Sequence, residues 1–71
     1  MIYRITDAFN VKNVTLLGLD RDRDVFDLGS SISLIEGIEY KVIDVHPKKF
    51  VTLEHVEKPE YLIGKNIELI P

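Results

Sequence analysis

The stretch from residue 38 to residue 56, which reads IEYKVIDVHPKKFVTLEHV, constrains the fold of this chain most. It contains two runs rich in β-branched and aromatic residues, separated by Pro47, Lys48 and Lys49. Such residues fit the pleated, half-buried surface of a sheet. Pro47 lacks a backbone N–H and biases His46 toward an extended conformation, so the first run should end there. The stretch therefore predicts a β-hairpin at the centre of the protein.

The rest of the chain divides into further short apolar runs with turn signals between them. Gly18, inside one of these runs, indicates a bulge or a close approach of two backbones. Six or so short strands, without a periodic helical pattern, predict an all-β fold, a small closed or partly open β-barrel of mainly antiparallel strands. Outside the hairpin, we expect a strand over 2–6, a short kink near Asp7–Ala8 before Phe9 and Val11, strands over 14–19 and 30–35, and a final strand that begins at Ile67 and ends at Pro71.

Length and composition limit the alternatives. The chain has 71 residues and no cysteine, so we expect one domain over residues 1–71 without disulfides. No apolar run approaches the roughly 20 residues of a membrane span, and the first residues lack a signal-peptide pattern. We therefore expect a cytoplasmic protein without a membrane partner. The net charge of −3 disfavours nonspecific binding to nucleic acid, which needs a basic surface.

The segment 20–24, DRDRD, places aspartates at alternate positions, as calcium-binding loops do. An EF-hand loop needs glycine at its sixth position and glutamate at its twelfth, where this chain has Val25 and Ser31. We therefore interpret the segment as a solvated connection that keeps a sheet edge soluble. Phe26 and Leu28, which follow it, are predicted to anchor the core.

The order of these signals resembles the second-domain β-barrel of the translational GTPases, the domain typified by elongation factor Tu. In that family a strand ending in aspartate, a small residue and phenylalanine precedes a strand with a late glycine, then a charged connection and an apolar-x-x-glycine step. The resemblance covers almost the whole chain and implies a barrel fold. It is carried by Asp7-Ala8-Phe9, by 14–19 with Gly18, by 26–29 and by the glycine turn in 61–67.

The chain also departs from this pattern. The turn at Lys12–Asn13 has no glycine, Ser30 stands where an acidic residue is common, and no P-loop is present. The resemblance therefore implies the barrel rather than GTP hydrolysis, and any function drawn from it is an analogy.

Lys48, Lys49 and Phe50 form the best basic-aromatic cluster in the sequence. Together with Tyr40 and Lys41, they could place a phosphate contact beside a stacking ring. The competing interpretation is a solvated turn with Phe50 in the core. We take these five residues as the candidate partner-binding site.

His46 and His55 stand near the ends of the hairpin strands and could form a metal or acid–base site with Asp44 or Glu57. A transition-metal site needs three or four ligands, and no nucleophile has a recognisable positioning motif. The serines of 29–33 do not form a G-x-S-x-G elbow, so we place them in a turn and on a strand surface. We predict no catalytic, cofactor or metal site.

The resulting expectation is a non-enzymatic binding module that presents a strand edge or a loop to a protein partner. Three alternatives stay open. The first is association with RNA or the ribosome through the basic turn. The second is a metal-binding or enzymatic role through His46 and His55. The third is a structural role, including a homodimer formed through exposed edge strands.

Overall fold

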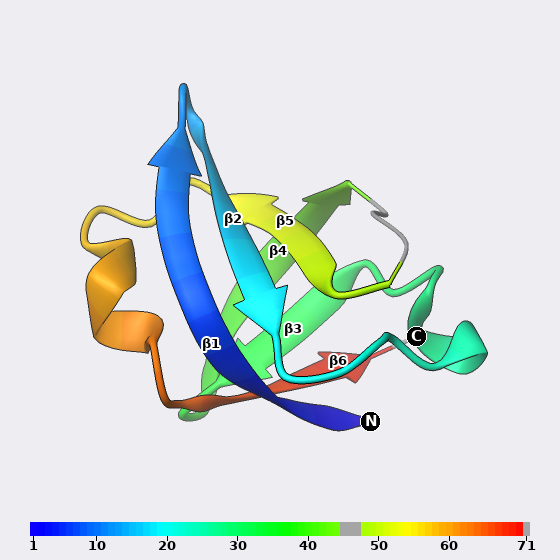
Figure 1. Cartoon of the computed structure of the whole chain (residues 1–71). Coiled ribbons are helices and arrows are strands. Elements are labelled where there is room, and N and C mark those ends of the chain that lie inside the picture. The colour runs from blue at the N-terminus through cyan, green and yellow to red at the C-terminus, as the bar shows by residue number, and fades with distance from the viewer. Residues whose placement is uncertain (45–47, 71) are drawn as a thin grey trace.

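The computed structural model describes residues 1–44 and 48–70, and over these residues it is a closed antiparallel β-barrel (Figure 1). The strands follow the ring in the order β1-β2-β5-β4-β3-β6, and β6 returns to pair with β1. The predicted all-β barrel is confirmed. Its described strands are β1 (Ile2–Val11), β2 (Val14–Leu19), β3 (Ile32–Ile35), β4 (Ile38–Asp44), β5 (Phe50–Glu54) and β6 (Asn66–Ile70).

Tight turns connect neighbouring strands where the sequence predicts them. Glu36 and Gly37 join β3 to β4 with φ values of 52° and 79°. Two positive φ values in a two-residue hairpin loop are typical of a type I′ turn, which matches the twist of the strands that it connects. Lys12, with φ 56°, begins the turn between β1 and β2. The central hairpin is also present, since Val42 on β4 pairs with Leu53 on β5.

β1 runs unbroken through the kink that the sequence predicts near Asp7, but its register shifts between Ile5 and Asp7. Such a β-bulge bends a strand and raises its twist. The first half of β1 can thus pair with β6 while the second half pairs with β2. Gly18 lies opposite Asp7, and a Cβ built on Gly18 would be 3.2 Å from the Asp7 Cβ. The predicted close approach at Gly18 is confirmed.

The core lies inside the ring, where alternate residues of each strand point inward. The row formed by Ala8, Leu17 and Val51 shows this pattern across three neighbouring strands. Leu62, which comes from a short 3-10 helix, closes the barrel from outside the sheet. The buried hydrophobic residues are Tyr3, Ile5, Ala8, Leu17, Leu19, Ile35, Val42, Val51, Leu53, Leu62, Ile67 and Leu69.

The connection between β2 and β3 contains a one-turn 3-10 helix, η1 (Val25–Asp27), and here the sequence-based interpretation is wrong. Phe26 does not anchor the core, because 81% of its surface is exposed. The Asp24 side chain accepts the Phe26 N–H at 2.9 Å and caps the helix, so that Asp27 turns inward instead. Arg23 is also buried, and segment 20–24 is therefore only partly solvated.

Two serines were expected on the surface and are buried. Ser33 is inaccessible to solvent and its hydroxyl donates to the Tyr40 carbonyl at 3.1 Å. Ser30 is also buried, after η1. The inward face of β3 is therefore formed by Ser33 and Ile35, whereas Ile32 and Leu34 lie half-buried on its outer face.

A second 3-10 helix, η2 (Pro59–Leu62), packs against β1 between β5 and β6 (Figure 1). It begins at a proline, which lacks only an N–H that the first turn of a helix leaves unpaired. Its buried residues are Pro59 and Leu62. The part of the chain that the structure describes contains no helix long and apolar enough to cross a membrane.

Candidate functional site

Strands β1, β2 and β5 carry a second set of cross-strand rows that points away from the core. Cross-strand partners lie on the same face of a sheet, so the register defines these rows directly. We call this surface the outer face. Its three rows are Asp7–Gly18–Phe50, Phe9–Leu16–Thr52 and Val11–Val14–Glu54.

The outer face is apolar although it faces solvent. Phe9, Val11 and Phe50 are 40%, 44% and 45% exposed, and Val14 and Leu16 are half-buried between them. Single exposed hydrophobic residues are normal on protein surfaces, but a contiguous patch rimmed by polar residues marks an interaction site. The outer face meets this description.

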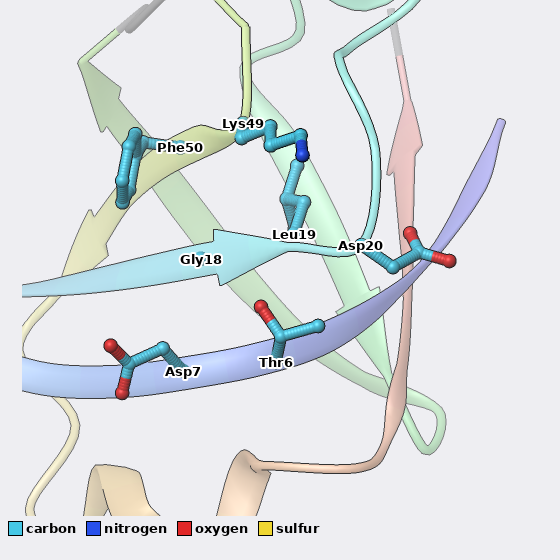
Figure 2. A pocket seen from close by; sticks show the side chains of 7 residues that line it. All are labelled: Thr6, Asp7, Gly18, Leu19, Asp20, Lys49 and Phe50. Atoms are coloured by element: carbon cyan, nitrogen blue, oxygen red, sulfur yellow. The ribbon is translucent and has the colours of Figure 1, made fainter.

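A hollow of about 340 Å³ opens at one end of the outer face, over Gly18 (Figure 2). Because Gly18 has no side chain, the space between Asp7 on β1 and Phe50 on β5 stays open. Figure 2 shows Thr6 and Asp7 along one side of this hollow and Lys49 and Phe50 along the other. We call it the Gly18 hollow; it is lined by Thr6, Asp7, Gly18, Leu19, Asp20, Lys49 and Phe50.

Charges of both signs surround the Gly18 hollow. The Asp20 carboxylate lies 3.4 Å from Arg21 Nη1 and accepts the Arg4 N–H at 3.2 Å. Asp7 accepts only the N–H of the next residue, at 3.0 Å, among the hydrogen bonds of the described residues. The charged side chains of the lining are therefore two carboxylates, Asp7 and Asp20, and the ammonium group of Lys49. The volume of the hollow is at the small end for a ligand pocket.

Backbone hydrogen bonds tie the end of β5 at the hollow to segment 20–24. The Lys49 carbonyl accepts the Leu19 N–H at 2.7 Å, and the Lys48 carbonyl accepts the Arg23 N–H at 2.9 Å. Arg23 Nη2 donates to the Asp27 carbonyl at 2.7 Å. The buried Arg23 therefore links η1 to the turn that presents Lys49 and Phe50, which fixes their position.

A buried cluster around Tyr3 holds the connection between β2 and β3, which contains segment 20–24 and η1. The Tyr3 hydroxyl donates to Asp27 Oδ2 at 2.6 Å and accepts the Asp24 N–H at 2.6 Å. The Arg21 guanidinium lies 4.3 Å from the centre of the Tyr3 ring, where its charge is attracted to the ring face. The Met1 ammonium group lies 3.5 Å from Asp27 Oδ1.

This environment favours the neutral form of Tyr3. Burial raises the pKa of the Tyr3 hydroxyl above its ordinary value of 10.0, and the hydrogen bond to the Asp27 carboxylate acts in the same direction. The Asp24 N–H and the Arg21 charge oppose this change without reversing it. Burial also lowers the pKa of Arg23, which Tyr3 and Asp27 partly offset.

The five predicted binding residues do not form a single site. Lys49 and Phe50 line the Gly18 hollow, and Lys48, exposed with φ 69°, lies in the turn beside it. Because 45% of Phe50 is exposed, the competing interpretation that places it in the core is wrong. Lys41 and Tyr40 lie elsewhere.

Lys41 lines a separate depression of about 320 Å³ with Ser31, Ile32, Glu39 and Glu54. There its N–H donates to Glu54 Oε2 at 2.8 Å, across the seam between β4 and β5. Tyr40 is half-buried and packs against the core.

Of the predicted histidine pair, only His55 lies within the described residues, and His46 lies outside them. His55 Nε2 is 3.3 Å from Asn10 Nδ2, which also donates to the Val56 carbonyl at 3.0 Å. Thr15 Oγ1 accepts the Val56 N–H at 2.8 Å, so these contacts tie the segment after β5 to the β1–β2 hairpin. Over residues 1–44 and 48–70, no group of three or more potential ligands is placed to hold a metal ion.

The outer face is not among the features predicted from the sequence, although its pattern is present there. Phe9 and Val11 alternate on β1, and Leu16 and Val14 alternate on β2, across a two-residue turn. Pairing outward positions across that turn would have placed these four apolar side chains together. Phe50 could not have been added, because β5 lies far away in the sequence.

No protein-family model matches the chain, and searches of curated proteins and of solved structures give no significant match.

Proposed function

We propose that this barrel is a non-enzymatic module that binds a protein partner through the outer face and the adjoining turn at Lys48 and Lys49. The observation that supports the proposal is the contiguous apolar surface of Phe9, Leu16 and Phe50 beside the Gly18 hollow. Aromatic residues are enriched at the energetically important positions of protein interfaces. A face of the barrel is favoured over a strand edge, because each described strand already has two neighbours in the ring.

The rigidity of the surface also supports binding. The outer face belongs to paired strands, and the turn beside it is held by the buried Arg23 and by the Tyr3 cluster. A preorganised surface loses little conformational entropy on association. We also propose, from the resemblance alone, that the chain is a relative of the second-domain barrel of translational GTPases.

The test is capture from native extract with the tagged chain, at low and at high salt, comparing Phe9→Ser with Phe26→Ser. Both changes remove an exposed phenylalanine, but Phe26 lies on η1, in the connection between β2 and β3, and belongs to none of the rows of the outer face. We expect a partner that is retained at both salt concentrations, lost with Phe9→Ser and kept with Phe26→Ser. If the Phe9→Ser variant still captures the partner, the proposed binding surface is contradicted.

Association with RNA is a second candidate, because Lys48, Lys49 and Phe50 are exposed side by side. A stacking ring beside two ammonium groups suits a single-stranded backbone. Binding of this kind weakens steeply with salt, because counterions are released from the phosphates. RNA that is recovered only at low salt and lost when both lysines become glutamine would favour this candidate.

A further inference from the structure

The charges at the corners of the outer face alternate in sign. On the β1 side, Asp7 stands at the hollow end and Lys12 follows Val11 at the other end. On the β5 side, Lys49 stands at the hollow end and Glu54 ends the strand. Corners on the same diagonal of the face therefore carry charges of the same sign, and corners that share an edge carry charges of opposite sign.

From this arrangement we infer that the outer face binds a second copy of this chain. The inference rests on the proposed function, because it uses the same surface. A two-fold axis that lies in the interface and runs across the strands exchanges the two ends of the face. The exchange of rows places Asp7 over Val11 of the second copy and Phe50 over its Glu54. Lys12 and Lys49 lie one residue beyond these rows, so Asp7 faces Lys12 of the second copy at one residue's distance, and Glu54 faces Lys49 in the same way. Each pair occurs twice, as an isologous interface requires.

The shape of the face is consistent with the same axis. The end row contains Gly18 and its hollow, and the row at the other end has Val14 at the equivalent position on β2. The exchange of ends places Val14 of each copy over the Gly18 hollow of the other. The middle row meets itself, so Phe9 and Leu16 pack on apolar partners. The strands of the two sheets run nearly aligned, as in common face-to-face sheet packing.

The size of the face predicts a weak dimer. The face consists of three rows of three residues together with Lys12 and Lys49. This is about half of the 20–30 residues that each partner contributes to a standard interface. An interface of roughly 800 Å² in total belongs to the weak, transient class. We therefore expect a dissociation constant on the order of 0.1 mM.

Sedimentation equilibrium of the whole chain at concentrations from about 0.01 to 1 mM tests the inference. The single change Asp7→Lys opposes two cations at both contacts with Lys12, and the single change Lys12→Asp opposes two anions at both contacts with Asp7. Each variant should dimerise about tenfold more weakly than the native chain. An equimolar mixture of the two variants restores both pairs and should recover the native affinity.

A matched control uses Asp7→Lys mixed with Lys49→Asp. In the inferred arrangement this mixture retains one repulsive contact at each end and should stay weak. Its recovery would indicate an axis along the strands and would overturn the proposed pairing. All three substituted residues are exposed, and the circular dichroism spectrum of each variant should match that of the native chain.

The remaining outcomes separate this inference from the proposed function. If the native chain stays monomeric at 1 mM while Phe9→Ser still abolishes capture of another protein, the inference fails and the proposed function stands. If the chain is monomeric and capture is unaffected by Phe9→Ser, both fail. Dimers whose affinity changes with neither charge substitution would show that the chain self-associates through another surface, which overturns the inference.

Discussion

Replacing Tyr3 with phenylalanine tests the cluster that holds the binding surface. The change keeps the ring and removes the hydroxyl, which is bonded to both Asp27 and Asp24. Asp27 is only 2% exposed, so water cannot replace the lost donor. A hydrogen bond to a charged group contributes about 1.5–3 kcal/mol, and one to a backbone amide about 0.5–1.5 kcal/mol. We expect Tyr3→Phe to lower the free energy of unfolding by roughly 2–4 kcal/mol.

This loss is large for a protein of this size. A small core supplies roughly 3–5 kcal/mol of stability, so Tyr3→Phe should leave the chain close to its unfolding midpoint. At about 4–8 °C for each kcal/mol, the melting temperature should fall by at least roughly 8 °C. Urea titration followed by far-ultraviolet circular dichroism measures the free energy directly.

Tyr61→Phe provides the matched control. The same hydroxyl oxygen is removed, but Tyr61 is 67% exposed, so water can replace any hydrogen bond that this hydroxyl made. A surface change of this kind should stay within about 0.5 kcal/mol of the native chain. If the two variants unfold at the same urea concentration, the hydrogen bonds of Tyr3 do not stabilise the barrel and the reasoning is refuted.

Three further predictions follow from the same contacts. Thr52→Val should raise the free energy of unfolding by up to about 1 kcal/mol, because the Thr52 hydroxyl is buried without a partner in the described residues. Thr15→Val should lower the free energy of unfolding by about 1–3 kcal/mol, because the Thr15 hydroxyl is hydrogen-bonded to Asn10 and Val56. Urea titration of both variants checks this pair of predictions, and changes of the same sign in the two variants would contradict it. Gly18→Ala should destabilise the chain by up to about 1 kcal/mol, because its Cβ would lie 3.2 Å from the Asp7 Cβ on the paired strand β1, and Asp7 would have to move by a few tenths of an ångström. Gly29→Ala, with open space around it, should change little in thermal melts. The pKa of Tyr3 is raised in the folded state, so the stability that its hydroxyl contributes is complete below about pH 10 and is lost as the pH rises through this higher pKa. The difference in the free energy of unfolding between the native chain and Tyr3→Phe should therefore shrink only above about pH 10. A difference that vanishes below about pH 8 would contradict this.

The fold could be predicted largely from local features. The central hairpin, the turns at Lys12 and at Glu36–Gly37 and the close approach at Gly18 follow from residue types over a few positions. The backbone preferences that produce these features act between near neighbours in the sequence. The class of the fold and most strand positions could therefore be inferred before the tertiary structure was known.

Burial was harder to infer from residue type alone. Phe26 is apolar and exposed, while Arg23 and Asp27 are charged and buried. The fold brings a partner to these buried polar groups, such as the Tyr3 hydroxyl for Asp27. A buried charge is tolerated only where such a partner exists, and local sequence does not reveal it.

The candidate site also combines features that local sequence determines with features that only the tertiary structure determines. Residue types and their spacing are enough to place Lys49 and Phe50 at a turn, and to let Phe9 and Leu16 share a face of one hairpin. The pairing of β5 with β2, which brings Phe50 beside Gly18 and creates the outer face, becomes visible in the folded barrel alone. Strand pairing in a closed barrel joins segments that are remote in the sequence. Their neighbours are set by closure of the ring and burial of the shared core, not by local preference.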